Sequence, residues 1–223
     1  MTVPRRLDAG RGTLPDPATV EMVVKHLKAG GLVALPTETV YGFSCIPEPG
    51  PLAKIMQLKN RDRDKPFLLL IPSVESVAEL DWPREARELA QVFWPGALTL
   101  ILADPGSRFP PGVRSPSGGV AVRVSPHPLA AALVEGVGRP LVSTSANLEG
   151  GEPALTGEEA FETAKTLGAG ADLWVLDGGP LPPSDPSTVI DCTGASPRVL
   201  RSGAIPVNRV RCVLPEIHGT SDE

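Results

Sequence analysis

Apolar residues recur along this chain in two alternating patterns, short continuous runs and helical stripes. Residues 32–35 (LVAL) and 67–71 (FLLLI) are continuous runs, which are typical of strands buried on both faces. Between Asp16 and Gly30, by contrast, valine and leucine recur at the i, i+3, i+4 and i+7 positions of a helix. Asp16 suits the N-cap of that helix and Gly30 its end. The first third of the chain therefore predicts strands alternating with helices.

The same alternation continues to the end of the chain. Further helices are expected at residues 51–59, 74–80, 84–93, 129–134 and 156–167, and further strands at 98–102, 120–124, 141–143, 173–176, 188–191 and 199–201. Because several strands are apolar throughout, we expect both faces of the sheet to be covered by helices. The pattern indicates an α/β fold with a mostly parallel or mixed sheet.

Composition and charge narrow the class of protein. The chain has 223 residues, 41% of them hydrophobic, which is enough for a substantial core. The formal net charge of −5 argues against a polycation that binds nucleic acid or membranes through overall charge, so any anion site is expected to be local. Three cysteines without a CxxC pair, no signal-like segment and no long apolar run predict a cytoplasmic protein without a membrane segment.

Polar motifs follow several of the predicted strands. PTET follows residues 32–35, STSAN ends the strand near residue 143, and an arginine lies in the sequence VLRSG near residue 201. Ligands of open α/β sheets usually bind beyond the carboxyl ends of the strands. These three motifs are therefore expected to contribute to one binding site.

The most densely charged segment is the loop KNRDRDKP at residues 59–66. Cations at alternate positions of an extended segment project to one side, and a polyphosphate needs several converging cations. A solvated surface loop is the competing interpretation, with Asp62 and Asp64 neutralising their basic neighbours. The loop by itself leaves both interpretations open.

Two hydroxyl-rich motifs have the chemistry of a binding site. PTETVYG at residues 36–42 offers two threonines that could recognise a zwitterion or a ribose, although they could equally cap the next element. STSAN at residues 143–147 could hold a phosphate or carboxylate, or form an ordinary Ser/Thr turn. The sequence contains no GxxxxGK[ST], GxGxxG or GxSxG motif, and no histidine pair at metal-ligand spacing. We therefore assign no nucleophile, general base or metal ligand.

Taken in order, seven motifs resemble those of the YrdC-like L-threonylcarbamoyladenylate synthases, in their short, single-domain form. The motifs are GGLVALPTETVYGFS, KNRDRDKPF, WPGALTLIL, VAVRVSPHP, STSAN with the following GEP, STVID and VLRSGAI. The resemblance implies a twisted open mixed sheet flanked by helices, with a large concave basic face. It also implies a catalytic domain at residues 16–208, between an N-terminal extension (1–15) and a C-terminal tail (209–223).

The resemblance implies roles for particular residues. ATP would be bound by Lys59, Arg61, Lys65, Ser143, Asn147, Thr156 and Arg201. Threonine would be bound by Thr37, Arg123, Ser145 and Ser187. In the basic loop, Arg61 and Lys65 match the family pattern, whereas Arg63 is expected to face water.

The implied reaction joins L-threonine, bicarbonate and ATP into threonylcarbamoyl-AMP and pyrophosphate, with Mg²⁺ accompanying the ATP. The product would serve the threonylcarbamoylation of adenosine in tRNA, so tRNA or tRNA-modification proteins are expected downstream partners. Three alternatives are a carbamoyl-transfer domain, which normally belongs to a much longer chain, a paralogue of the same fold without synthase activity, and a non-enzymatic RNA-binding module. Negative net charge and the lack of interleaved aromatic and basic residues count against RNA binding.

Overall fold

A computed structural model describes residues 3–10, 15–61 and 64–219. The elements are β1 (Arg5–Asp8), α1 (Pro17–Lys28), β2 (Leu32–Pro36), β3 (Tyr41–Cys45), α2 (Pro49–Leu58), β4 (Leu68–Leu70), the 3₁₀ turn η1 (Val74–Val77), α3 (Arg84–Phe93), β5 (Leu98–Ala103), β6 (Gly119–Arg123), α4 (Pro128–Val137), β7 (Leu141–Ser145), α5 (Gly157–Thr166), β8 (Leu173–Asp177), β9 (Thr188–Asp191), β10 (Arg198–Arg201), α6 (Val207–Arg211) and β11 (His218–Gly219). The predicted alternation of strands and helices is confirmed.

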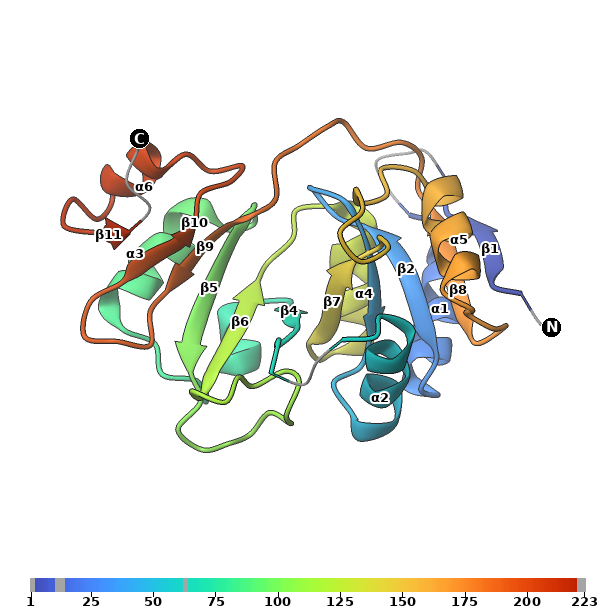
Figure 1. Ribbon diagram of the computed structural model, residues 1–223, viewed down its shortest axis with the longest axis horizontal. Helices are drawn as coiled ribbons and strands as arrows, with labels where there is room; N and C mark the ends of the chain where they lie inside the picture. The colour runs from blue at the N-terminus through green and yellow to red at the C-terminus, as the bar shows by residue number, and fades with distance from the viewer. Residues whose placement is uncertain (1–2, 11–14, 62–63, 220–223) are drawn as a thin grey trace.

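All strands of the described residues join one twisted sheet, in the order β1-β8-β2-β3-β7-β4-β6-β5-β9-β10-β11 (Figure 1). The sheet is mixed: β2 pairs parallel with β8 but antiparallel with β3, and β6 pairs parallel with β4 but antiparallel with β5. The order brings segments far apart in the sequence side by side. β3 lies next to β7, for example, about halfway across the sheet.

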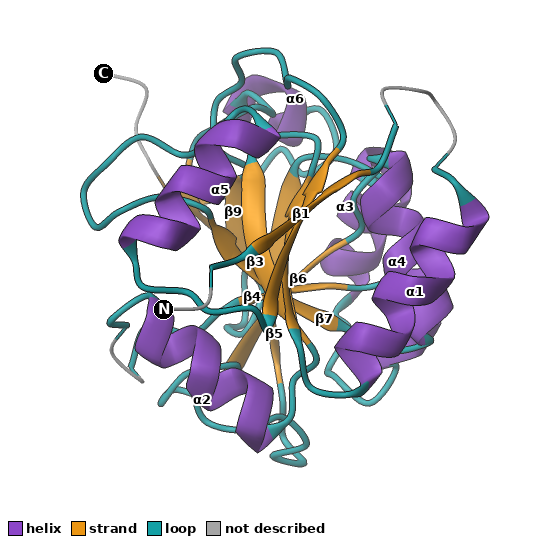
Figure 2. Ribbon diagram, turned by 90° about the vertical axis from the view of Figure 1, so that its right-hand side faces the viewer, coloured by secondary structure: helices purple, strands orange, loops and turns teal. Residues whose placement is uncertain are grey.

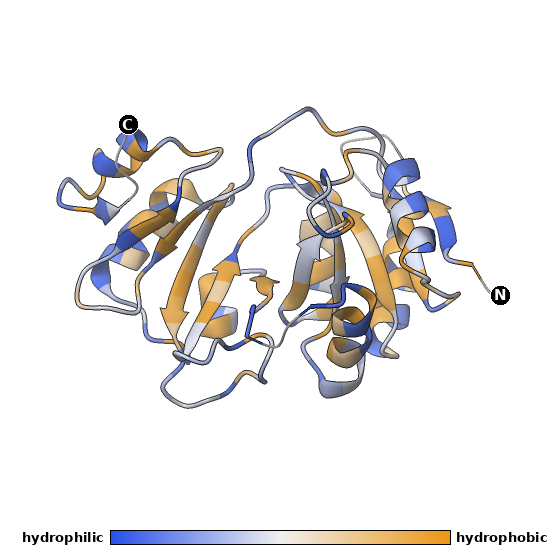
Figure 3. Ribbon diagram, in the orientation of Figure 1, coloured by the Kyte–Doolittle hydropathy of each residue, from blue (hydrophilic) through white to orange (hydrophobic). Residues whose placement is uncertain are grey.

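Helices cover both faces of the sheet, with α1, α3 and α4 on one side and α2 and α5 on the other (Figure 2). Strand β2 shows how one apolar run serves both layers. Leu32 and Ala34 belong to one buried cluster, whereas Val33 and Leu35 pack with α1 and α4 in a second cluster. Because strand side chains alternate between faces, a strand buried on both sides must be apolar at every position. Figure 3 shows this contrast between the hydrophobic strands β2 and β5 and the polar outer surface of α2 and α5.

Two predicted elements differ from the structure near the motif regions. The helix expected at residues 74–80 is reduced to the 3₁₀ turn η1, and only Val77 of that turn is buried. Residues 41–45, the first two of which belong to the PTETVYG motif, form strand β3, which was not predicted and whose five residues are all buried. Because both faces of β3 are covered, its sequence shows no alternation of polar and apolar residues that would indicate a strand.

The two ends of the chain also contain elements that were not predicted. Within the expected N-terminal extension, β1 pairs parallel with β8, but its sequence RRLD has only one apolar residue because it lies at the sheet edge. At the other end, α6 extends across the start of the expected tail, and β11 lies inside it. Val207 and Val210 of α6 are buried at i, i+3 spacing, and Ile217 packs against the same core. None of the helices in the described residues is both long and apolar enough to cross a membrane.

Candidate anion-binding site

A cavity of about 350 Å³ lies over the middle of the sheet. It is lined by side chains and backbone from β3, β7, β4, β6, β5, β9 and β10 and from the loops that follow β2 and precede β4 and β9. Its polar lining residues are Thr37, Thr39, Arg61, Thr99, Arg123, Ser143, Thr144, Ser145, Ser187 and Arg201. Gly42 of β3 also lines the cavity, and a Cβ there would crowd the wall because it would lie only 3.0 Å from the Ser143 Oγ.

Arg201, at the end of β10, is fixed by the residue that precedes β9. Its Nε and Nη2 donate to the carbonyl oxygen of Ser187 at 3.0 and 2.8 Å, and Nη2 also contacts the Ser187 Oγ at 3.2 Å. The Ser187 hydroxyl shares a 2.9 Å hydrogen bond with Thr99 of β5. Burial lowers the pKa of Arg201. The guanidinium is therefore held in a defined place by neutral groups.

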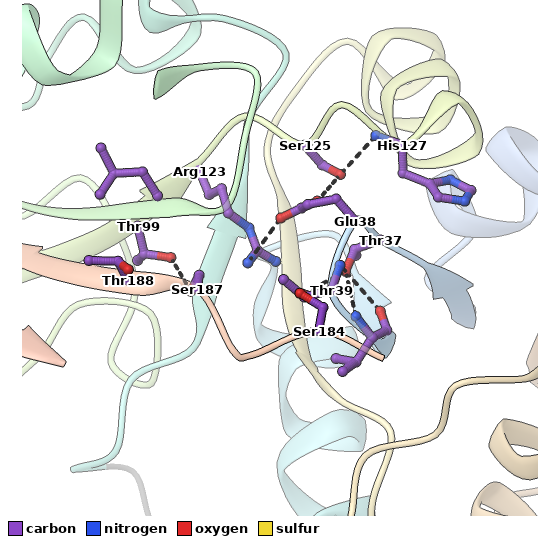
Figure 4. A network of polar contacts seen from close by, with 12 residues as sticks. Thr37, Glu38, Thr39, Thr99, Arg123, Ser125, His127, Ser184, Ser187 and Thr188 are labelled. Atoms are coloured by element: carbon purple, nitrogen blue, oxygen red, sulfur yellow. Dashed lines mark hydrogen bonds and ion pairs between the residues drawn. The ribbon is translucent and has the colours of Figure 1, made fainter. Parts of the chain in front are cut away.

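Arg123, at the end of β6, is buried beside a carboxylate. Its Nη1 lies 3.2 Å from Glu38 Oε1, and Ser125 Oγ donates to Glu38 Oε2 at 2.5 Å (Figure 4). The backbone N–H of His127 donates in turn to Ser125 at 3.2 Å. Burial lowers the pKa of Arg123, and the charge of Glu38 opposes that shift. Glu38 and Ser125 were not among the predicted site residues, although Glu38 stands inside the PTET motif.

The PTET segment forms a turn that is closed by its own threonine. Thr37 Oγ1 donates to the carbonyl oxygen of Val40 at 2.8 Å and receives the backbone N–H of Thr39 at 3.3 Å. Both threonines are almost completely buried and line the cavity. The two interpretations of this motif are thus compatible, since the Thr37 hydroxyl stabilises the turn at the wall of the cavity.

Lys59, at the C-cap of α2, ties together the loop that follows β7. Its Nζ donates to the carbonyl oxygens of Ser145 (3.1 Å) and Asn147 (2.5 Å) and to Asn147 Oδ1 (2.9 Å). Asn147 Oδ1 also accepts the Ser145 hydroxyl at 2.6 Å. Burial and repulsion from Arg61 lower the pKa of Lys59 to about 8. An ammonium has three donors, and here all three are used by the STSAN loop.

Arg61 forms hydrogen bonds with the backbone of residues near the other end of the basic loop. Its Nε donates to the carbonyl oxygen of Lys65 at 2.8 Å and its Nη2 to that of Pro66 at 3.0 Å. The guanidinium lies over the ring of Phe67, 4.8 Å from the centroid. Burial lowers the pKa of Arg61. The prediction for Arg63, and the charges proposed for Asp62, fall outside the described residues.

Four cations thus gather at one small space: Arg61, Arg123 and Arg201 line it, and Lys59 lies behind its wall. In each case burial is the largest cause that lowers the pKa, because loss of water disfavours the charged form. A bound anion would relieve this cost for all four. The arrangement therefore favours a polyanionic ligand.

Similarity to known proteins agrees with this geometry. The family model described as "Telomere recombination", which covers Sua5, YciO and YrdC, matches residues 25–203. The chain belongs to the Sua5/YciO/YrdC family. It is 38% identical over 195 residues to a putative threonylcarbamoyl-AMP synthase of Mycobacterium tuberculosis, covering 86% of this chain and 87% of that protein. It is likewise 38% identical to the threonylcarbamoyl-AMP synthase of Stenotrophomonas maltophilia, covering 82% and 98% of the two chains.

Solved structures of the Sua5/YciO/YrdC family share the fold. The crystal structure of Pyrococcus abyssi Sua5 complexed with L-threonine has a TM-score of 0.84 and 30% identity, and the match covers 99% of this chain but only 62% of that one. Escherichia coli YciO has a TM-score of 0.77 and 26% identity, with 93% and 98% of the two chains covered. The expected mixed α/β sheet flanked by helices is therefore confirmed as the family fold.

The structure gathers most of the predicted site residues of this family member. Of the eleven, seven line the cavity: Thr37, Arg61, Arg123, Ser143, Ser145, Ser187 and Arg201. Lys59 and Asn147 lie behind its wall, joined to Ser145. Lys65 is exposed and does not line the cavity.

Thr156 lies apart from these residues. Its Oγ1 accepts the backbone N–H of Glu159 at 3.1 Å, and the Glu159 carboxylate accepts the Thr156 N–H in return. This reciprocal capping box starts α5, as the Thr-x-x-Glu spacing indicates. In this structure Thr156 is thus the N-cap residue of α5.

Proposed function

We propose that this protein is an L-threonylcarbamoyladenylate synthase, which converts L-threonine, bicarbonate and ATP into threonylcarbamoyl-AMP and pyrophosphate. The observation that carries the proposal is the set of four cations at one cavity, of which Arg123 is buried and Lys59 and Arg61 are half-buried, in a chain whose net charge is −5. The names of the bacterial relatives, and the L-threonine bound to a homologue of the same fold, support the choice of substrates.

The three substrates share the cavity in a defined way. Arg123 pairs with the carboxylate of threonine, while Thr37, Ser145 and Ser187 contribute hydroxyls beside it. Arg61 and Arg201 are the proposed phosphate contacts, and Ser143, also assigned to ATP, lines the same cavity. Lys65, Asn147 and Thr156 also belong to the predicted ATP set, and their roles stay predictions.

The reaction needs positioned charge more than it needs a protein nucleophile. The threonine amine first forms an N–C bond with bicarbonate, releasing water, or with carbon dioxide, releasing a proton, to give a carbamate. A carbamate oxygen then forms a bond to the α-phosphorus, and the bond from that phosphorus to the bridging oxygen breaks to release pyrophosphate. Because both reactants are anions, fixed cations reduce their repulsion and stabilise the charge that accumulates in the transition state. The described residues contain no group of three or more acidic, histidine or cysteine side chains suited to a metal ion. We expect Mg²⁺ to accompany the ATP and to be bound mainly to its phosphates.

The test is a pyrophosphate-release assay in which each substrate is omitted in turn. Release is expected only with threonine, bicarbonate and ATP present together. Equal release without threonine, or none with all three, would contradict the proposal. The second outcome would favour a paralogue without synthase activity.

An RNA-binding module is the proposal of a different class. It predicts RNA binding without ATP, with an affinity that falls steeply as salt increases. The proposed role in tRNA modification does not require this protein to bind RNA, because the adenylate product would be passed to other proteins. We also propose that this takes place in the cytoplasm. If the protein binds RNA only slightly more tightly than an unrelated acidic protein does, the RNA-binding alternative is rejected and the synthase proposal is retained.

A further inference from the structure

One buried ion pair at the cavity wall has no assigned role. Arg123 and Glu38 are separated along the chain, one at the end of β6 and the other in the turn after β2, yet their Nη1 and Oε1 atoms lie 3.2 Å apart. The side chains are only 6% and 13% exposed. A pair buried to this degree needs good geometry, because both charges have lost water.

The pairing leaves part of each group unsatisfied. Within the described residues, Arg123 Nε and Glu38 Oε1 are buried atoms without a geometrically sound hydrogen-bond partner. A guanidinium carries five N–H donors, so a contact through Nη1 leaves other donors for a second anion. Glu38 thus holds Arg123 through Nη1, and Arg123 also lines the cavity.

Glu38 is itself fixed from behind. Ser125 donates to its Oε2, and Ser125 receives the backbone N–H of His127, which is the N-cap residue of α4 (Figure 4). The chain of contacts thus runs from the start of a helix, through Ser125 and Glu38, to the guanidinium at the cavity. Such a chain of contacts restricts the rotation of a side chain that lines a binding cavity.

We propose that Glu38, held by Ser125, is a positioning residue that orients the guanidinium of Arg123 toward the carboxylate of the amino-acid substrate in the cavity. This inference rests on the proposed function. It assigns Glu38 to the recognition of threonine and gives it no contact with ATP. The nearby cation Arg201 is held by Ser187, so it does not depend on Glu38.

Positioning and simple charge compensation predict opposite results for Glu38→Gln. If Glu38 only neutralised Arg123, its loss would leave more positive charge for an anionic substrate, and threonine would bind more tightly. If Glu38 orients Arg123, the glutamine holds it less firmly and threonine binds more weakly. The sign of the change in threonine affinity therefore separates the two roles.

The experiment measures threonine binding by titration calorimetry and the KM values for threonine and ATP in the full-length protein. For Glu38→Gln we expect threonine affinity to fall about tenfold, the effect of weakening one charge-assisted contact, with little change in the KM for ATP. Ser125→Ala keeps every charge but releases Glu38, and a smaller fall in threonine affinity is expected. Glu48→Gln is the matched control, since Glu48 pairs with Arg139 at 2.8 Å on the exposed surface.

Unchanged or tighter threonine binding by Glu38→Gln would overturn the inference, as would equal losses of threonine and ATP affinity. Thermal melting shows whether each variant is folded. If Glu38→Gln does not fold, Ser125→Ala decides the matter, and a variant that binds threonine like the wild type overturns the proposal. A wild-type protein that binds no threonine would instead refute the proposed function, and this inference with it.

Discussion

Replacing Arg61 with alanine separates the phosphate role of the basic loop from its structural role. The guanidinium donates to two loop carbonyls, of Lys65 and Pro66, and lies over Phe67. It also lines the cavity, where burial lowers its pKa. A charge-assisted contact to a phosphate contributes about 1.5–3 kcal/mol, and 1.4 kcal/mol is about tenfold in affinity. We therefore expect Arg61→Ala to weaken ATP binding about 10- to 100-fold.

The effect on stability is expected to be much smaller. The two lost hydrogen bonds belong to a half-exposed loop, and a cation–π contact at such a site contributes about 0.5–1 kcal/mol. A total of roughly 1 kcal/mol corresponds to about 2–4 °C in Tm for a chain of this size. Arg61→Lys keeps the charge but lacks the planar fork that bridges both carbonyls, so an intermediate loss of ATP affinity is expected.

Titration calorimetry with ATP and thermal melting measure the two effects side by side. The matched control is Arg5→Ala, because Arg5 lies 5.0 Å from the centroid of Trp174 in a comparable contact outside the cavity. Arg5→Ala is expected to leave ATP affinity unchanged. If Arg61→Ala binds ATP within about twofold of that control, the phosphate role of Arg61 is refuted.

Two further predictions concern the residues behind the cavity wall. The pKa of Lys59 is lowered to about 8, and a bound polyanion raises the pKa of a nearby cation. ATP binding near pH 8 should therefore be accompanied by proton uptake. Calorimetry in buffers of different ionisation enthalpy measures this uptake, and Lys59→Met should abolish it. Persistent uptake in Lys59→Met would assign the proton to another group. Thr156→Ala should lower the free energy of unfolding by about 1 kcal/mol through loss of the N-cap, with ATP affinity unchanged, whereas a large loss of ATP affinity would restore Thr156 to the binding site.

Sequence patterns predicted the elements that bury apolar side chains and missed those that depend on position in the sheet. β2 and β4 are apolar at every position because helices cover both faces of the sheet. β1 is an edge strand whose sequence, RRLD, carries almost no apolar signal, so its backbone pairing with β8 could not be inferred. α6 is a single short helix, and its two buried valines are too few to establish a period.

The site could be predicted as a set of residues but not as a set of contacts. PTET and STSAN come together because β3 pairs with β7, an adjacency that no local pattern in the sequence specifies. The sequence marked Lys59 as an ATP ligand, whereas the folded loop uses its three donors for Ser145 and Asn147. Glu38 stood in a recognised motif, but its pairing with Arg123 across the cavity wall appears only in three dimensions.

The way the four cations are held explains how an acidic protein keeps a strongly positive site. Three of the cations are oriented mainly by carbonyl oxygens. Lys59 donates to those of Ser145 and Asn147, and Arg61 to those of Lys65 and Pro66. Arg201 donates to that of Ser187. A carbonyl fixes the direction of a cation without cancelling its charge, so most of the field remains available to a ligand. Among the described residues, Arg123 is the one cation of the four that is paired with a carboxylate. This exception is consistent with two different roles. Three cations would offset the charge of a polyphosphate, whereas Arg123 would bind a single substrate carboxylate in a fixed orientation.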